Sequence, residues 1–308
     1  MTGTTMTAIR KKVRRGAGAP FAARRINLFY LPAILLFLGF TIYPLVNGFI
    51  LSLSNWNGYS PSRSFIGLGN YFRLASDPVF HNTLINTFIY GFGSTILQQI
   101  LGLSLALALD RAIRGRNVAR AIIYLPVLVS PVVMGTMYYL LFSYDNGGLN
   151  DIVVALGGDK VAWLSQAGTS VAIIVLVNSV QFVGISMVIY LAGLQSIPTV
   201  YYEASQLDGA DAWHQFTQIT VPLLQPAFAT SVVLNLIGGL KLFDVIQVLT
   251  GGGPGYATNS VSTLIGKAYF DNQSAGYASA MGIVLFIIIA VLTLIFNTVL
   301  NRRRLEGL

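Results

Sequence analysis

The sequence contains no cysteine, few histidines and little charge. The absence of cysteine among 308 residues excludes disulfide bonds and thiolate metal sites. The two histidines, His81 and His214, lie far apart in the sequence, which argues against a histidine metal site or a catalytic triad. Charged residues make up only 10% of the chain and hydrophobic residues 54%, whereas soluble proteins average about 25% charged residues. The composition therefore predicts a protein whose natural solvent is lipid.

Six apolar runs are each long enough to cross a bilayer, which requires about 20 residues. Backbone groups in lipid must be hydrogen-bonded internally, and the runs lack the alternation of barrel strands, so we expect helices. The first run is too long for a signal peptide and no A-x-A pattern follows it, so we interpret it as a retained helix. The expected fold is an all-α integral membrane protein with six transmembrane helices. The runs cover residues 28–52, 84–109, 120–142, 170–193, 222–249 and 277–300.

The placement of lysine and arginine predicts the orientation in the membrane. Fourteen of these residues lie in the N-terminal tail (1–26), in the loop between the second and third runs, and in the C-terminal tail (302–308). The loops on the other side contain four. We therefore expect a transmembrane domain over residues 27–301 with both termini in the cytoplasm. The basic residues indicate topology rather than a nucleic-acid partner.

The loop between the fourth and fifth runs, residues 196–222, is expected in the cytoplasm yet contains no lysine or arginine. Pro198 suits a first helical turn, and Asp208-Gly209 is typical of a helix end. A second short helix can begin at Ala210, with Asp211 near its positive N-terminus. Helices that lie on lipid usually carry basic residues, so docking into a groove of a partner protein is favoured over an amphipathic hairpin on the membrane surface.

A motif with specific spacing lies in this loop. Glu203-Ala204-Ser205 is followed after three residues by Gly209, and after nine more by Ile219-Thr220-Val221-Pro222. This pattern resembles the coupling motif of ABC importer permeases, with Ser205 in place of an alanine and Val221 in place of a leucine. The resemblance implies a helix-turn-helix that seats on a separate ATPase subunit. The residues expected to couple the chain to that ATPase are Glu203, Ala204, Ser205, Leu207, Gly209, Trp213, Phe216, Ile219 and Pro222.

Other segments resemble the carbohydrate-uptake type of this family, and in particular its maltose F-subunit-like half. The resemblance covers residues 27–303 and implies a second permease subunit in a heterodimer, two ATP-binding subunits and an extracytoplasmic sugar-binding protein. It implies no cofactor in this chain, because ATP and Mg are bound by the partner ATPase. The segments are Phe65–Phe72, Asp77–Phe80, Asn86-Thr87, Leu125-Pro126, Ser130-Pro131, Phe243-Asp244 and Leu249–Pro254.

Two glycine patterns fail as nucleotide sites. Gly266-Lys267 lacks the glycine and the Ser or Thr of a P-loop, since Val261 and Ala268 occupy those positions. Gly67-x-Gly69 lacks the third glycine of a dinucleotide fingerprint. ATP must therefore be bound by another chain.

Three amides lie near the middle of apolar runs. Asn178 and Gln181 are three residues apart and share a face of the fourth helix, and Asn235 lies in the fifth. Such groups either line a substrate pathway or only join helices by hydrogen bonds. Lys241 and Asp244 are expected to form a local ion pair, with sugar binding or gating as the alternative.

The sequence thus predicts a non-enzymatic permease subunit for a sugar, either a mono- or an oligosaccharide, with a polyol or a glycerol phosphate as alternative substrates. The alternative is a proton- or ion-coupled secondary transporter, which tends to carry acids deep in the membrane. Asp110 and Asp244 instead lie toward the ends of runs. A membrane enzyme would require clustered catalytic groups, and none cluster along this sequence. Asparagine, glutamine and aromatic residues suit hydroxyl-rich ligands, but they do not identify the sugar.

Overall fold

The computed structural model describes residues 30–111 and 114–301, so both basic tails, residues 1–26 and 302–308, lie outside the described residues. The chain divides into two compact units, residues 1–47 and 48–308. The described part of the first unit is helical throughout. It consists of α2 (Leu31–Phe37), the π-helical turn η1 (Leu38–Ile42) and the beginning of α3 (Tyr43–Ser52).

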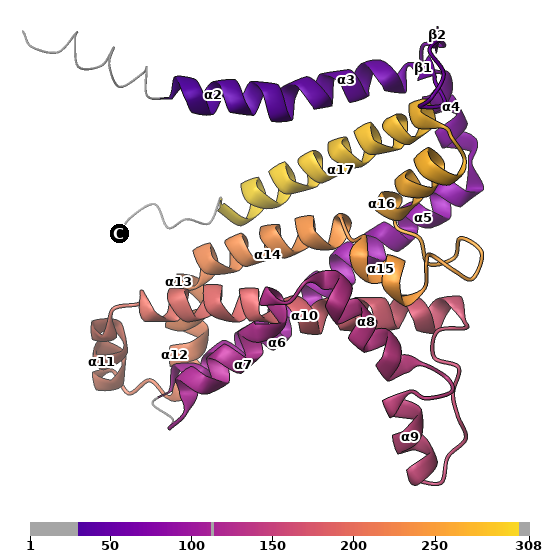
Figure 1. Cartoon of the computed structure of the whole chain (residues 1–308). Coiled ribbons are helices and arrows are strands. Elements are labelled where there is room, and N and C mark those ends of the chain that lie inside the picture. The colour runs from indigo at the N-terminus through magenta and orange to yellow at the C-terminus, as the bar shows by residue number, and fades with distance from the viewer. Residues whose placement is uncertain (1–29, 112–113, 302–308) are drawn as a thin grey trace, which may run out of the picture. The chain divides into compact units, whose positions relative to one another are not determined.

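The second unit contains an antiparallel pair of strands, each two residues long, and a series of helices (Figure 1). The hairpin and the helices that follow it, up to the masked residues, are β1 (Ser54–Asn55), β2 (Ser64–Phe65), α4 (Gly69–Ser76), α5 (Pro78–Phe88), η2 (Ile89–Gly93) and α6 (Ser94–Asp110). The middle of the chain forms α7 (Arg116–Leu128), α8 (Pro131–Phe142), α9 (Gly148–Ala155), α10 (Ala167–Gln195) and α11 (Thr199–Leu207). The remaining elements are α12 (Ala212–Gln215), η3 (Phe216–Thr220), α13 (Val221–Leu223), α14 (Gln225–Leu240), α15 (Asp244–Leu249), α16 (Val261–Gly266), η4 (Lys267–Asp271) and α17 (Ala275–Asn301).

Four helices in the described ranges are long and apolar enough to cross a membrane. Two further pairs of helices reach that length only when each bent pair is counted as one span, which gives up to six. The second predicted span begins six residues earlier than expected, at Pro78, because the Asp77 carboxylate accepts from the backbone N–H of Val79 at 2.9 Å and caps the helix. The unbroken spans are Leu31–Ser52, Pro78–Asp110, Ala167–Gln195 and Ala275–Leu300.

The third and fifth predicted spans are bent, which the apolar pattern did not indicate. Between α7 and α8 the direction changes by 99° at Val129 and Ser130. Ser130 precedes Pro131, and a residue before proline is driven out of the helical region of the backbone. Before α14 the chain bends by 61° around Leu224. Pro226 has no N–H to donate to the preceding turn, which weakens the helix there.

The fifth span also ends earlier than residue 249. The helix α14 stops at Leu240, and a separate short helix, α15, begins at Asp244. The break leaves the carbonyl oxygen of Leu242 without a partner in the helix. This oxygen instead accepts a hydrogen bond of 2.6 Å from the buried Ser260 hydroxyl. A polar side chain from the 256–261 segment therefore replaces a helical hydrogen bond.

Glycines allow the long helices to cross at close range. A Cβ atom added to Gly102 of α6 would lie 2.4 Å from Ser186 Cβ of α10. A Cβ added to Gly239 of α14 would lie 2.8 Å from Gly91 Cα of η2. Small residues at helix interfaces are typical of membrane bundles, because backbone contact replaces the missing hydrophobic driving force.

The helix α10 is central to the second unit and packs against α6, α14 and α7. At its C-terminal end lies the hairpin formed by α11 and α12, which projects from one end of the unit (Figure 1). The elements β1, β2 and α4 lie at the other end, beside the start of α17 (Figure 1). The positions of these two ends matter for the sites described below.

Candidate functional site

The 199–220 hairpin consists of α11, a tight corner, α12 and η3. Gly209 occupies the corner with φ at +81°, a left-handed conformation that glycine adopts without strain. The second helix begins at Ala212, two residues later than predicted, because Asp211 acts as its N-cap and accepts from the backbone N–H of His214 at 2.8 Å. Hydrogen bonds from the His214 backbone and ring hold the pKa of the Asp211 carboxyl below its usual value.

Hydrogen bonds join the two arms of the hairpin. The Gln215 side-chain amide donates to the Ser205 hydroxyl at 3.1 Å, so the serine that replaces an alanine of the motif bonds across the corner. The Tyr202 and Thr220 hydroxyls lie 2.9 Å apart at the base. Tyr202 and Ile219 pack against a buried cluster that includes Leu194 of α10 and Leu224 before α14. The hairpin is thus a rigid unit attached to both flanking helices.

Other apolar side chains of the hairpin are exposed. Leu207 is 91% exposed and Trp213 is 68% exposed. The Trp213 and Phe216 rings contact each other, with centroids 5.9 Å apart. Glu203 and Ala204 are exposed, as is Pro222. A folded hairpin that presents a carboxylate beside exposed apolar groups has the character of a docking surface.

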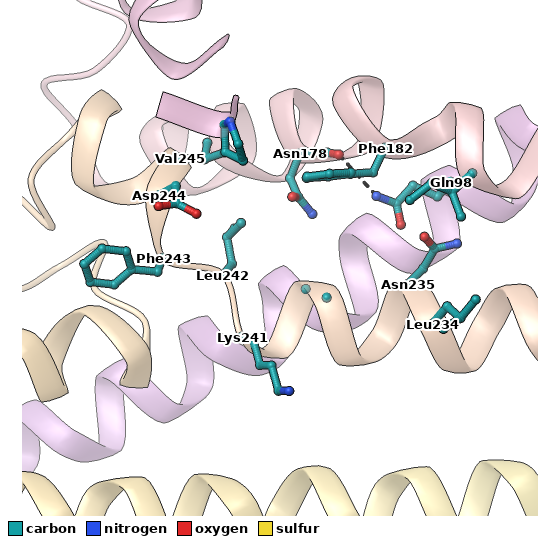
Figure 2. Close-up of a pocket in the computed structure, with 14 residues that line it drawn as sticks. Gln98, Asn178, Phe182, Leu234, Asn235, Lys241, Leu242, Phe243, Asp244 and Val245 are labelled. Carbon is teal, nitrogen blue, oxygen red and sulfur yellow. Dashed lines mark hydrogen bonds between the residues drawn. The ribbon is translucent and has the colours of Figure 1, made fainter. Parts of the chain in front are cut away.

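A cavity of about 220 Å³ lies between α6, α10, α14 and α15. Asn178 and Asn235 both line it, and Gln98 of α6 is a third amide in its wall (Figure 2). Gln181 does not line this cavity. It is fully buried, and neither atom of its amide has a hydrogen-bond partner.

The cavity amides also join helices. Gln98 Nε2 donates to the carbonyl oxygen of Asn178 at 3.2 Å, as Figure 2 shows. Asn235 Nδ2 donates to the Ser186 hydroxyl at 2.6 Å and to the Ser231 hydroxyl at 3.3 Å. Among the described residues the Asn178 side chain makes no such bond to a neighbouring helix, so its polar atoms remain available in the cavity wall.

The expected ion pair between Lys241 and Asp244 is wrong. No salt bridge joins them within the described ranges, and Figure 2 shows the two side chains pointing in different directions. The physical reason is the break in the helix, since Lys241 follows the end of α14 while Asp244 begins α15. Both residues line the cavity instead.

Gln98 is the wall residue that sequence reasoning missed. The adjacent amides Gln98 and Gln99 inside an apolar run were the available signal. As for metals, the described residues contain no group of three or more His, Cys, Asp or Glu side chains that could hold an ion.

Comparison with known proteins identifies components of ABC transporters as relatives. A permease from Bacillus subtilis, "Probable ABC transporter permease protein YurN", is 38% identical over 271 residues, which is 87% of this chain and 92% of that protein. The "Trehalose/maltose transport system permease protein MalF" from Thermococcus litoralis is 36% identical, over 90% of this chain and 94% of that protein. The chain is also similar in fold to one from the crystal structure of a bacterial alginate ABC transporter in complex with an alginate pentasaccharide-bound periplasmic protein. That match has a TM-score of 0.80 and 25% identity, and covers 94% of this chain and 98% of the other.

The family described as "Binding-protein-dependent transport system inner membrane component" matches residues 98–306, a range that contains both the hairpin and the cavity. Members of this family are transport components and not enzymes, and ATP hydrolysis in ABC importers belongs to separate ATPase subunits. With relatives of more than 30% identity along most of its length, this membrane protein belongs to the binding-protein-dependent permease subunits of ABC transporters.

Proposed function

We propose that the chain forms half of the translocation pathway of a binding-protein-dependent importer for a sugar. It would cross the membrane six times with both termini in the cytoplasm, pair with a second permease subunit and bind two ATPase subunits, which hold ATP and Mg. An extracytoplasmic binding protein would deliver the sugar. A mono- or oligosaccharide is the proposed substrate, because the cavity wall combines amides with the aromatic rings of Phe182 and Phe243.

The observation that carries this proposal is the rigid 199–220 hairpin with its exposed Leu207 and Trp213. Its base packs on the ends of α10 and α14, and these two helices also supply Asn178 and Asn235 to the cavity. A displacement of the hairpin by an ATPase partner would therefore move both helices that line the cavity. In this proposal ATP-driven motion changes access to the cavity, and the chain itself performs no chemistry.

The first test concerns the hairpin. Gly209→Val places a β-branched residue at a left-handed position, which costs about 1–2 kcal/mol locally, and Glu203→Lys reverses the exposed charge. We expect both variants to insert normally but to lose ATPase pull-down, or to hydrolyse ATP without sugar uptake in reconstituted vesicles. Gly157→Val is a matched control, since Gly157 also has a positive φ (+84°) and open space around it. Normal uptake, ATPase stimulation and pull-down in both hairpin variants would refute the coupling role.

The second test concerns the pathway. We propose that Asn178, Gln181 and Asn235 lie along it, with Asn178 and Asn235 in the cavity wall. Each is changed singly to leucine, and sugar uptake is compared with assembly and basal ATPase activity. Asn178→Leu should lower uptake while leaving assembly intact, because among the described residues the Asn178 side chain makes no hydrogen bond to another helix. If all three variants transport normally, these amides do not lie along the pathway.

A further inference from the structure

A polar cavity of about 250 Å³ lies at the end of the second unit remote from the 199–220 hairpin. The last turn of α17 meets the start of α14 near the hairpin, because the Gln225 side chain donates to the carbonyl oxygen of Leu300. The polar cavity borders the start of α17, where Ser274 precedes the helix and Tyr277 lies in its first turn. At 1.5 Å per residue the two ends of α17 are roughly 39 Å apart. In the proposed topology this cavity faces the outside.

The walls of the polar cavity are fixed by local hydrogen bonds. The Trp56 indole lines it, and its Nε1 donates to the carbonyl oxygen of Ser60 at 2.8 Å. The Asn57 side-chain oxygen accepts from the backbone N–H groups of Tyr59 at 3.0 Å and Ser60 at 2.7 Å. The carbonyl oxygen of Trp56 accepts from Gly276 at 2.9 Å, which ties this loop to α17. The cavity is therefore preorganised rather than a gap between mobile loops.

Gln273 lines the opposite side of the cavity in an unfavourable backbone conformation. In the part of the chain that the structure describes it is the one non-glycine residue with a positive φ, at +47°. Residues held in this region are strained and cluster at sites of function. Glycine would occupy the position without strain, so the presence of glutamine suggests that its side-chain amide is used.

Arg73 lines the cavity, and its charge is offset by Asp77, a carboxylate that lies next to the cavity and not in its lining. The Arg73 guanidinium lies 4.2 Å from the centroid of the Tyr277 ring, and the Tyr277 hydroxyl donates to Asp77 at 2.5 Å. Burial alone would raise the pKa of the Asp77 carboxyl, but bonds from Tyr277 and from the start of α5, together with Arg73, hold this pKa below its usual value. Asp77 is therefore ionised and offsets Arg73. A neutral polar ligand suits such a site better than an anion.

We propose that this outer cavity binds one ring of a neutral saccharide, at a site separate from the cavity in the middle of the helices. The inference rests on the proposed function, because an imported sugar would meet this cavity on the outer side of the membrane. Hydroxyl groups both donate and accept, as do the amides of Asn55 and Gln273 and the Ser62 hydroxyl. The half-buried Trp56 indole offers an apolar surface for a sugar face. The volume is smaller than the roughly 300–1,000 Å³ of pockets for drug-sized ligands, which favours a single ring.

The experiment uses tryptophan fluorescence, because the chain has only three tryptophans. The full chain carrying Trp163→Phe and Trp213→Phe, purified in detergent, reports on Trp56 alone. It is titrated with glucose, trehalose, maltose and maltotriose in the absence of a binding protein. We expect a saturable change in Trp56 emission with at least one of these sugars. Adding Gln273→Gly, which relieves the backbone and removes the amide, should weaken that binding roughly three- to tenfold.

The matched control retains Trp163 alone, through Trp56→Phe and Trp213→Phe. Trp163 is anchored elsewhere, by a hydrogen bond of 2.9 Å from its Nε1 to Asn150, and should not respond. A flat Trp56 titration with all four sugars, or an equal response of Trp163, overturns the inference. A response of Trp56 to the sugar-free binding protein alone would make the surface a protein contact and would also overturn it.

The outcome is distinguishable from failure of the proposed function. ATP-driven uptake of the same sugars is measured in vesicles containing the complete importer with its native tryptophans, because Trp213 belongs to the proposed coupling hairpin. Uptake without any Trp56 response refutes the outer site and leaves the proposed function intact. A saturable Trp56 response in an importer that transports none of these sugars supports the site and contradicts the proposed function.

Discussion

The close crossing of α14 and η2 allows a sharp prediction from two adjacent glycines. A Cβ atom added to Gly239 would lie 2.8 Å from Gly91 Cα and 2.9 Å from the carbonyl oxygen of Tyr90. A Cβ added to Gly238 would meet nothing within 4 Å. Gly239→Ala should therefore force the two helices apart, whereas Gly238→Ala should fit without movement.

The magnitude follows from the geometry. Carbon atoms approach favourably at about 3.5–4.0 Å, so the helices would have to separate by about 0.7–1.2 Å. The obstructing atoms belong to the backbone and cannot rotate away as a side chain can. Overpacking of this kind costs about 1–3 kcal/mol. Alanine is favoured over glycine inside a helix by about 0.8–1.0 kcal/mol, but this gain is common to both variants. The difference between them thus isolates the contact.

The free energy of unfolding is measured for both variants in the same detergent. We expect Gly239→Ala to be less stable than Gly238→Ala by about 1–3 kcal/mol. Transport is not the readout, because both glycines border the central cavity, which is the one between α6, α10, α14 and α15. Equal stability of the two variants, within about 0.5 kcal/mol, would refute the view that backbone contact at Gly239 holds this crossing together.

Two further predictions concern the topology and the 143–163 segment. The chain has no native cysteine, so single introduced cysteines can be labelled specifically. Cysteines at Ser60 and Gly157 should react with an impermeant thiol reagent from outside, while one at Ser205 should be protected in intact cells. Labelling at position 205 from outside would overturn the topology. Asn150→Ala should destabilise the protein by about 2–4 kcal/mol and expose this segment to protease, because its buried amide takes part in five hydrogen bonds. Asn146→Ala, at an exposed position of the same segment, should change neither property, and equal proteolysis of the two variants would contradict the assignment.

Much of the helical architecture was predictable because it depends on local chemistry. Long apolar runs indicated helices, and the Asp208-Gly209 pair indicated the corner at Gly209. The start of the second span was missed although the signal was present, since Asp77-Pro78 is a cap followed by a proline in the first turn. The family was also predictable, because the motif in the hairpin has specific spacing.

The composition of the central cavity was less predictable. The helix α10 is apolar on all sides and packs against several helices, so its sequence does not show which face borders a space. Asn178 and Gln181 are three residues apart, which turns them about 60° from each other around the helix axis. That rotation is enough to place Asn178 in the cavity wall and to bury Gln181 elsewhere. Gln98 belongs to another helix, and only tertiary packing brings it to the same wall.

The helix breaks and the central cavity have a common physical origin. Backbone that is not helical is tolerated within an apolar bundle only where protein groups or a water-filled cavity satisfy it. Pro131, which follows the bend between α7 and α8, lines the cavity, and so do Lys241 and Phe243 in the break before α15. The carbonyl of Leu242 in that break is satisfied by Ser260. A break without such partners would be costly, and the breaks next to Pro131 and before α15 both border the cavity. Pro131 and the pair Gly238-Gly239 thus lie in walls of the cavity that the mid-span amides alone did not indicate.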